Sequence, residues 1–429
     1  MGFQGSNWQT TRGKFAALAT ASIFGLVLSG CAGSVGGSED SNESEGLPLG
    51  ATAAEYQEAL ADMPETTLVY QPEAPSGEAI SSPRALEFKK RVEEVSGGKL
   101  KIEIVWGQAV AGYSEVVDAL GDGRVDIATI LPIYSPAEFP VNDAFIVGST
   151  LGGSSPLAGE LASNAALLEV AWNSEEFLAE LDSHGVVPLI PFYGDGNQFA
   201  MCSSEVSEDS GWSGLQNRVS SSTQNEQISA LGASPVSLEY PEIYEALQRG
   251  TIDCAMAHGA AATGNGFLEV APHYVYSDEV SFGRGAQSVV AGSNFEKLPL
   301  AAKQLIFDEM LTLFEQQLIT SIQGNINISN AIDEHNGSAR TLNDEEVAQL
   351  TDVSAELLDE KVEAGVVPEG FYDELTESIE KWRATAAEMG LGDEGDLQSF
   401  SEWYNPETDA VRDFAEKVYD DVMAEHRPN

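Results

Sequence analysis

The sequence predicts an α/β protein built from two related lobes. Strand and helix patterns alternate through residues 66–131, which is typical of a largely parallel sheet with helices on its faces. Residues 115–128 and 242–255 repeat one fourteen-residue pattern of charged, apolar and glycine positions. Any helix–glycine–strand unit can look similar, but agreement over the whole segment favours two related lobes. Glycine-rich segments at 194–196 and 283–285 would let the chain cross between them.

Length and charge limit the possible functions. The chain has 429 residues, enough for two or three domains, and its 69 acidic and 21 basic residues give a formal charge of −48. Binding of nucleic acid through its phosphates needs a basic surface, so broad binding of this kind is excluded. The charge indicates a heavily hydrated surface suited to high salt, although an acidic secreted protein would look the same.

The N-terminus has the features of an export signal. Arg12 and Lys14 precede an apolar run at 15–28, which is too short to span a bilayer comfortably. The sequence LSGC ending at Cys31 resembles a bacterial lipobox, in which the cysteine is lipidated and becomes the mature N-terminus. An ordinary signal peptide with an incidental cysteine is the alternative. We therefore expect an extracytoplasmic protein that is anchored to the membrane by a lipid on Cys31. A flexible tether rich in Gly, Ser and Glu is expected to follow this cysteine.

The first lobe follows this tether. Residues 53–61 are compatible with a short helix, and 66–70 with a strand. An amphipathic helix is expected over 83–95, a strand over 100–106 and, after the first repeat, another strand over 125–131. This order predicts parallel strands joined by helices.

The remaining elements suggest how the lobes are divided. A helix around 158–172 and a strand at 186–192 precede the second lobe, and a strand at 288–291 and a long helical region at 300–333 follow it. Further acidic helices run to the end. The expected divisions are a signal peptide (1–31), a tether (32–64), lobe I (65–195 with 286–345), and lobe II with the C-terminal helices (196–285 with part of 346–429).

Residues 211–258 hold the main motifs of the second lobe. A strand carrying Arg218 leads through a polar turn into a helix, and a short extended run then ends at Tyr240. Pro241 opens an amphipathic helix, because its fixed φ suits the first helical turn. A strand at 251–256 completes the second repeat.

The order of these segments resembles a known family. After the lipobox come VEEVSGGKLKIEIVWGQ, EVVDALGDGRVDIA, GLQNRV, ALGASPVSLEYPEIYEALQRGTID and SNFEKLP, as in TRAP-transporter substrate-binding proteins of the DctP type. The similarity runs from about Thr66 to Asn336. It implies a two-lobed fold like that of periplasmic binding proteins, with a hinge and a long helix spanning both lobes. It also implies that a small organic acid is captured in the interlobe cleft and passed, unchanged, to a membrane permease.

The resemblance extends to site residues. In the family, the arginine of the Gly-Leu-x-x-Arg strand binds the ligand carboxylate, and Arg218 occupies that place. Without the motif, Arg218 would be read as a surface arginine paired with an acid. Many members carry a second arginine at the first crossing, where this chain has uncharged residues, and the family's polar first-lobe positions fall on Tyr113, Leu131 and Tyr134. We therefore expect a monocarboxylate with an apolar or hydroxylated body. The predicted ligand-binding residues are Arg218, Gln198, Asn197, Tyr240, Tyr113, Tyr134, His258 and Arg284.

Other functions have weaker support. Cys254 as a thiolate with His258 as its base would make an exported enzyme, but closeness in the chain is poor evidence for such a dyad. His258 is either a ligand contact or a polar residue at a strand end. No zinc or nucleotide motif occurs, so we predict no metal and no cofactor. A surface receptor that feeds a sensor would use the same cleft and is the alternative function.

Two cysteines remain in the exported chain. An even pair outside the cytoplasm suggests a disulfide between Cys202 and Cys254. In the family that the chain resembles, the strand entering lobe II runs antiparallel beside the strand that carries Cys254, which would bring the two residues together. Two reduced core cysteines are the alternative.

Overall fold

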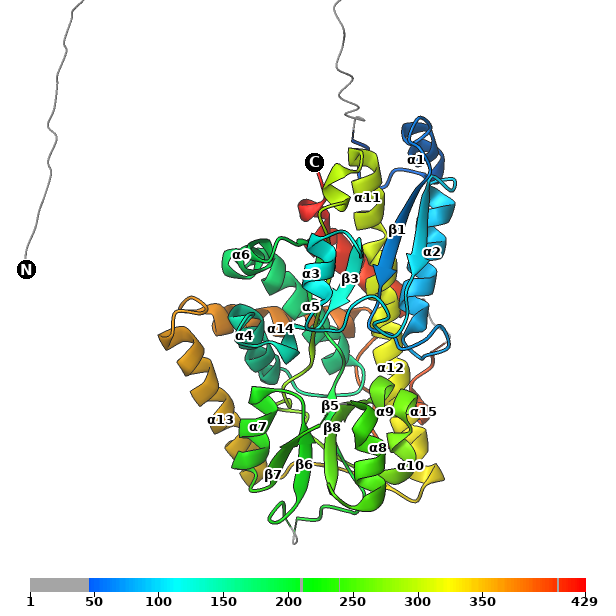
Figure 1. Ribbon diagram of the computed structural model, residues 1–429. Coiled ribbons are helices and arrows are strands. Elements are labelled where there is room, and N and C mark those ends of the chain that lie inside the picture. Colours follow the sequence, from blue (N-terminus) through cyan, green and yellow to red (C-terminus); the bar gives the residue numbers. More distant parts are fainter. Residues whose placement is uncertain (1–45, 209–210, 239, 407–408) are drawn as a thin grey trace, which may run out of the picture. The chain divides into compact units, whose positions relative to one another are not determined.

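The computed structural model describes residues 46–208, 211–238, 240–406 and 409–429, which belong to one compact unit with two β-sheets (Figure 1). The expected signal peptide, Cys31 and residues 32–45 of the expected tether lie outside the described residues. Within the described ranges, no helix combines the length and apolar character that crossing a membrane requires.

The first lobe is built around a five-stranded sheet with the order β2-β1-β3-β10-β4. All strands run in one direction except β10, which returns from the second lobe and pairs antiparallel with both β3 and β4. Its elements are α1 (Ala53–Ala59), β1 (Thr66–Gln71), α2 (Ser82–Val95), β2 (Leu100–Ile104), α3 (Val116–Gly121), β3 (Ile127–Ile130), η1 (Pro132–Tyr134), α4 (Pro140–Gly148), η2 (Ser149–Leu151), α5 (Ala158–Asn173), α6 (Glu175–Ser183), β4 (Val187–Gly194), β10 (Ala286–Ala291), η3 (Phe295–Lys297) and α11 (Leu300–Asp308).

The second lobe is built around a six-stranded sheet with the order β11-β9-β5-β8-β6-β7. Here β5, the strand that enters the lobe, is the antiparallel one. Its elements are β5 (Gln198–Cys202), β6 (Gln216–Val219), α7 (Ser222–Ala230), β7 (Ser234–Ser237), α8 (Tyr240–Arg249), β8 (Cys254–His258), α9 (Gly259–Asn265), α10 (Phe267–Val270), β9 (His273–Tyr276) and β11 (Ser338–Thr341).

The repeat forms the same structure in each lobe. The first copy is α3 followed by β3, and the second is α8 followed by β8. The aspartate of each copy explains part of the pattern, because it accepts a hydrogen bond from the backbone of the neighbouring strand. Val69 N–H donates to Asp126 Oδ2 at 2.7 Å, and Gln216 N–H donates to Asp253 Oδ2 at 2.8 Å. The prediction of two related lobes is confirmed.

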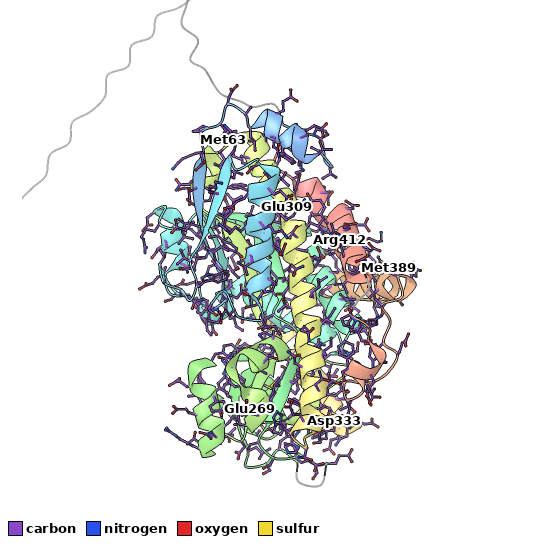
Figure 2. The ribbon with its side chains drawn as sticks, turned by 90° about the vertical axis from the view of Figure 1, so that its right-hand side faces the viewer. Met63, Glu269, Glu309, Asp333, Met389 and Arg412 are labelled. Atoms are coloured by element: carbon purple, nitrogen blue, oxygen red, sulfur yellow. A yellow bond between two sulfur atoms is a disulfide. The ribbon has the colours of Figure 1, made fainter. Side chains whose placement is uncertain are left out.

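A long helix, α12 (Met310–Glu334), runs along both lobes. Figure 2 shows it between the labelled residues Glu309 and Asp333. Leu313, Phe314 and Leu318 belong to the core of the first lobe, whereas Ile328 and Ile332 belong to a core of the second. The remaining elements are α13 (Asp344–Glu363), α14 (Phe371–Glu388), α15 (Phe400–Trp403), α16 (Ala410–Val418), η4 (Tyr419–Met423) and η5 (Ala424–His426).

The structure changes the expected division of the chain in two places. The tether cannot reach residue 64, because α1 is folded: its Thr52 forms a capping box with Glu55, and Tyr56 is buried with its hydroxyl bonded to Asp308 on α11. The first lobe does not extend to residue 345, because β11 pairs in parallel with β9 of the second lobe.

Candidate functional site

The chain crosses between the lobes at the two predicted segments, and these crossings lie side by side. The first passes through Asp195 and Gly196, and the second through Arg284 and Gly285. Asp195 N–H donates to the Gly285 carbonyl at 3.0 Å, and Gly285 N–H donates to Asp195 Oδ1 at 2.9 Å. Gly196 has a φ of 124°, which residues with side chains rarely adopt, so the crossing needs a glycine there. These bonds fix the two crossings to each other.

Arg284 is bound inside the first lobe. Its side chain and that of Glu160 on α5 are both 0% exposed, and Nη1 lies 3.3 Å from Glu160 Oε1. Nη2 donates to the side-chain oxygen of Asn197, whose N–H in turn donates to Glu160 Oε2 at 2.8 Å. Arg284 and Asn197, both predicted as ligand contacts, are thus bonded to each other and to a buried carboxylate.

Arg218 lies on β6, between β8 and β7, and is 1% exposed. Nε donates to the Leu238 carbonyl at 2.8 Å, and Nη1 donates to the Met256 carbonyl at 3.1 Å. The guanidinium carbon lies 4.6 Å from the centre of the Tyr240 ring, a favourable cation–π contact. Among the residues described, Arg218 has no carboxylate partner, whereas the buried Arg84 and Arg284 each have one.

Tyr240 begins helix α8 and does not end a strand, because β7 already stops at Ser237. Burial raises the pKa of Tyr240; Arg218 opposes this shift, and Asp195 and Tyr134 add to it. Tyr134 belongs to the first lobe, so the two lobes approach each other closely enough here for their side chains to interact electrostatically.

The remaining predicted tyrosine, Tyr113, lies beside Tyr134 on the first lobe. Tyr113 stacks on Tyr134, with ring centres 5.6 Å apart and planes inclined by 29°. Tyr134 is 39% exposed, and the Tyr113 hydroxyl donates to the Glu73 carbonyl at 3.4 Å. The structure therefore brings Tyr113 and Tyr134 together on the first lobe, and Tyr240 and Arg218 together on the second.

Gln198 and His258 meet at Asp195. They are directly paired in the β5–β8 ladder. Gln198 Nε2 donates to Asp195 Oδ1 at 2.9 Å, and His258 Nε2 lies 3.6 Å from Asp195 Oδ2. The predicted residues thus fall into three groups: a tyrosine pair, an arginine with its tyrosine, and a glutamine and histidine around a carboxylate.

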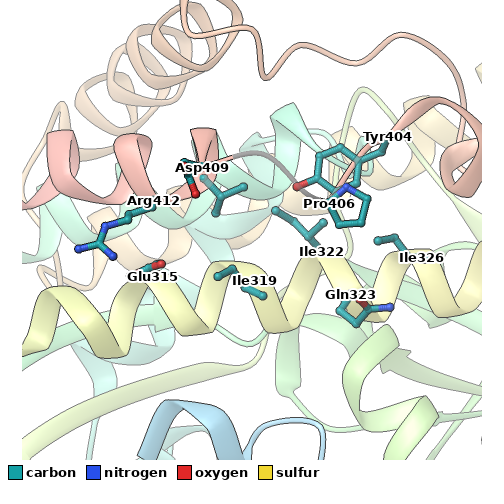
Figure 3. Close-up of a pocket in the computed structure, with 10 residues that line it drawn as sticks. Glu315, Ile319, Ile322, Gln323, Ile326, Tyr404, Pro406, Asp409 and Arg412 are labelled. Carbon is teal, nitrogen blue, oxygen red and sulfur yellow. The ribbon is translucent and has the colours of Figure 1, made fainter. Parts of the chain in front are cut away.

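One surface cavity lies beside the predicted ligand-binding residues, and another lies away from them. One, of about 240 Å³, is lined by Tyr113 and Leu131 together with residues of η1, α3 and the loop before α4. The other, of about 350 Å³, lies between α12 and a segment formed by Tyr404, Pro406 and residues 409–412 (Figure 3). Figure 3 shows Ile319 and Ile322 on its floor and Arg412 beside Glu315 at one end. None of the predicted ligand-binding residues lines this second cavity.

Residues 74–364 match the family described as bacterial extracellular solute-binding protein, family 7 (DctP). This match spans more than half of the chain. The chain belongs to this family. The predicted relation to the DctP-type proteins is therefore confirmed, and so is the prediction of a binding protein without enzymatic activity, because the family consists of extracellular solute-binding proteins.

Several solved structures have a similar fold. A TRAP solute-binding protein from a marine metagenome, specific for aromatic acids and bound to 3-hydroxybenzoate, has a TM-score of 0.63 at 18% identity and covers 74% of this chain and 99% of its own. A TRAP solute-binding protein from Rhodoferax ferrireducens with copurified benzoate gives 0.63 at 17% identity, covering 75% and 99%. The sugar acid binding protein from Advenella mimigardefordensis with galactonate gives 0.58 at 18%, covering 75% and 100%.

A curated relative aligns with a smaller part of the chain. The uncharacterized protein YiiZ of Salmonella typhimurium is 26% identical over 198 residues, which is 45% of this chain. The alignment spans 57% of that relative, so the chain matches little more than half of its length.

The disulfide is present as predicted. Cys202 and Cys254 are bonded, and they face each other in the β5–β8 ladder. Because the Cys254 sulfur is bonded to Cys202, it cannot serve as a thiolate, and the alternative of a Cys254–His258 dyad is excluded. In the part of the chain that the structure describes, no group of three or more His, Cys, Asp or Glu side chains could hold a metal ion.

Two features of this family member were missed in the sequence. Asp195 was recognised only as part of the first crossing, although an acid between two glycines is well placed there to bond across to the second crossing. Arg84 on α2 donates to Glu73 and to Gln317 on α12, and Gln317 Nε2 donates to the Gly194 carbonyl at 2.9 Å. The position of Glu73, just beyond the carboxyl end of β1, was the available signal.

Proposed function

We propose that the protein captures one small monocarboxylate between its lobes, with the carboxylate on Arg218, and delivers it to a TRAP-type membrane permease. The observation that carries this proposal is the burial of Arg218 without a carboxylate partner among the described residues. Two donors of its guanidinium are used by carbonyl groups, which hold the group in place without neutralising it. A buried charge is stable only when it is compensated, so an anion from outside is the natural partner.

The buried arginines of the described residues favour a ligand with one carboxylate over a ligand with two. Arg84 is paired with Glu73 and Arg284 with Glu160, so neither is available for a second ligand carboxylate. Asp195 adds a negative charge close to Tyr240, which would repel a second anionic group. The site therefore suits a ligand with a single negative end.

The aromatic side chains suggest the nature of the ligand body. Tyr113 and Tyr134 form a stacked pair on the first lobe, and Tyr240 lies over Arg218 on the second. Aromatic side chains pack well against rings and apolar groups. Structures of similar fold hold 3-hydroxybenzoate, benzoate or galactonate, all with one carboxylate. An aromatic or hydroxylated monocarboxylate is therefore the ligand class that we propose.

Substitution of Arg218 tests the anchor. Titration calorimetry with benzoate, 3-hydroxybenzoate and galactonate should identify a ligand for the wild-type protein. Arg218→Ala should then weaken binding by about 2–5 kcal/mol, and Arg218→Lys should also weaken it, because lysine lacks the planar fork. Arg249→Ala is the matched control, since Arg249 is an exposed arginine of the same lobe with its own partner, Glu245. Full affinity in Arg218→Ala would remove Arg218 from the site.

Anchoring and lobe closure need separate tests. We propose that Cys31 carries the lipid, so Cys31→Ser should release the protein from the membrane fraction of the producing cell. Small-angle scattering with and without ligand should show contraction, because a ligand held by both lobes favours their closed arrangement. An unchanged radius of gyration at saturation would argue against capture between the lobes.

A further inference from the structure

In the described part of the chain, only one oxygen of the Asp195 carboxylate accepts hydrogen bonds. Oδ1 accepts from Gly285 N–H and from Gln198 Nε2, both at 2.9 Å. Oδ2 has the His258 ring as its neighbour, and the distance of 3.6 Å to Nε2 is too long for a good hydrogen bond. Within the described residues, no donor is seen bonded to Oδ2. The Oδ2 atom is not fully buried, so water or a ligand can reach it.

The His258 ring is the neighbour of Asp195 Oδ2. Its side chain is 14% exposed and that of Asp195 is 11% exposed, so little bulk water reaches either. Because Nε2 faces a carboxylate, we assign the ring hydrogen to Nε2. An oxygen atom placed about 2.8 Å from both groups would accept from Nε2–H and donate to Oδ2. Since Nε2 and Oδ2 lie 3.6 Å apart, one atom can be within hydrogen-bond distance of both.

This pair is close to the proposed carboxylate anchor. His258 follows Met256 by two residues on β8, or about 7 Å along the strand, and the Met256 carbonyl accepts from Arg218 Nη1. Asp195 also lies near enough to Tyr240, which covers Arg218, to interact with it electrostatically. A ligand bound to Arg218 could therefore reach Asp195 with a second polar group.

We propose that Asp195 and His258 form a second subsite, which selects ligands carrying a hydroxyl group in addition to the carboxylate. This inference rests on the proposed function. A hydroxyl both donates and accepts, and so satisfies the carboxylate and the imidazole N–H together. A second carboxylate would face Asp195 with like charge. An ammonium group could donate to Asp195, but it has no acceptor for the Nε2–H of His258 in the assigned tautomer.

Matched ligand pairs test this selection. Calorimetry should compare 3-hydroxybenzoate with benzoate, mandelate with phenylacetate, and lactate with propionate. In at least one pair, the hydroxylated acid should bind the wild-type protein about 10- to 100-fold more tightly, as expected for a hydrogen bond to a charged group. Asp195→Asn should remove most of this preference and change the affinity for the partner without the hydroxyl by less than about threefold, because asparagine can still accept from Gly285 N–H.

Further variants separate selection from folding. His258→Gln should reduce the same preference, and the melting temperature of each variant should show that it remains folded. Arg218→Ala should weaken both members of a pair equally, which distinguishes the anchor from the subsite. Equal binding of both members of every pair by the wild-type protein, or an unchanged preference in Asp195→Asn, would overturn this inference and leave the anchor intact. Tighter binding of amino acids than of hydroxy acids would overturn it in favour of an ammonium site. If no acid in any pair binds, this inference and the proposed ligand class both fail.

Discussion

Replacement of Arg284 should cost stability and leave ligand binding largely intact. Arg284→Met removes the positive charge but leaves the carboxylate of Glu160 buried at 0% exposure, with Asn164 and the Asn197 N–H as its remaining donors. Breaking a buried ion pair in this way costs about 3–5 kcal/mol. That is a large part of the 5–15 kcal/mol by which a typical domain is stable.

A double-mutant cycle isolates the pair. Glu160→Gln alone should cost a similar amount, because it leaves the buried Arg284 guanidinium without its counter-charge. The double variant should lose less than the sum of the two, with a coupling of roughly 2–3 kcal/mol in urea unfolding followed by circular dichroism. Arg249→Met is the control for loss of an exposed arginine.

The outcome also decides whether Arg284 meets the ligand. If Arg284 were a ligand contact, as the sequence suggested, Arg284→Met would lose affinity and leave the free energy of unfolding nearly unchanged. Additive losses in the cycle, or a loss below about 1 kcal/mol in each single variant, would refute the reasoning from burial.

Three further predictions follow from the cross-link, the charges and one buried acid. Reduction of the Cys202–Cys254 bond should lower the free energy of unfolding by about 4 kcal/mol, since its sequence separation is 52 residues; equal guanidinium midpoints with and without reductant would contradict this. Burial raises the pKa of Glu180 to about 7 from 4.5, against hydrogen bonds from Asn142 and Val141 that lower it. The folded state therefore holds this proton more tightly, and its stabilising effect should be complete below pH 4.5 and lost as pH rises through about 7. The loss should be at most about 3 kcal/mol, reduced by solvent screening, and absent in Glu180→Gln; parallel pH profiles of the two proteins would contradict it. With a formal charge of −48, the melting temperature should rise with salt, and a melting temperature indifferent to salt would count against a salt-adapted surface.

Regular features could be predicted from the sequence because they depend on local patterns. The repeat at 115–128 and 242–255 encodes a helix, a glycine and a strand in each lobe, and the structure confirms both copies. The disulfide followed from two cysteines and the expected order of strands. The long helix followed from apolar periodicity through 300–333, although the structure divides it into α11 and α12.

The partners of charged side chains could not be predicted in the same way. Arg218 and Arg284 look alike in the sequence, since each is an isolated arginine with a glycine within four positions. Arg284 meets Glu160, which is 124 positions away in the chain, and Arg218 meets no carboxylate among the described residues. Only the folded arrangement of α5 against the crossings separates a structural arginine from one that is available to a ligand. For the same reason, Asp195 was not recognised as a bonding group.

The contact between α9 and α12 has a mechanical consequence. Gly259 lies so close to Gly324 that a Cβ added to Gly259 would lie 2.4 Å from the Gly324 backbone, so the two helices touch through their main chains. The 25 residues of α12 make a stiff rod about 37 Å long, seated in the first lobe by its N-terminal half. A slide of the second lobe along this rod would press neighbouring side chains into the space that the two glycines leave. We therefore expect α9 to stay fixed against α12 when the lobes open, and a methyl group at either glycine to force these two helices apart.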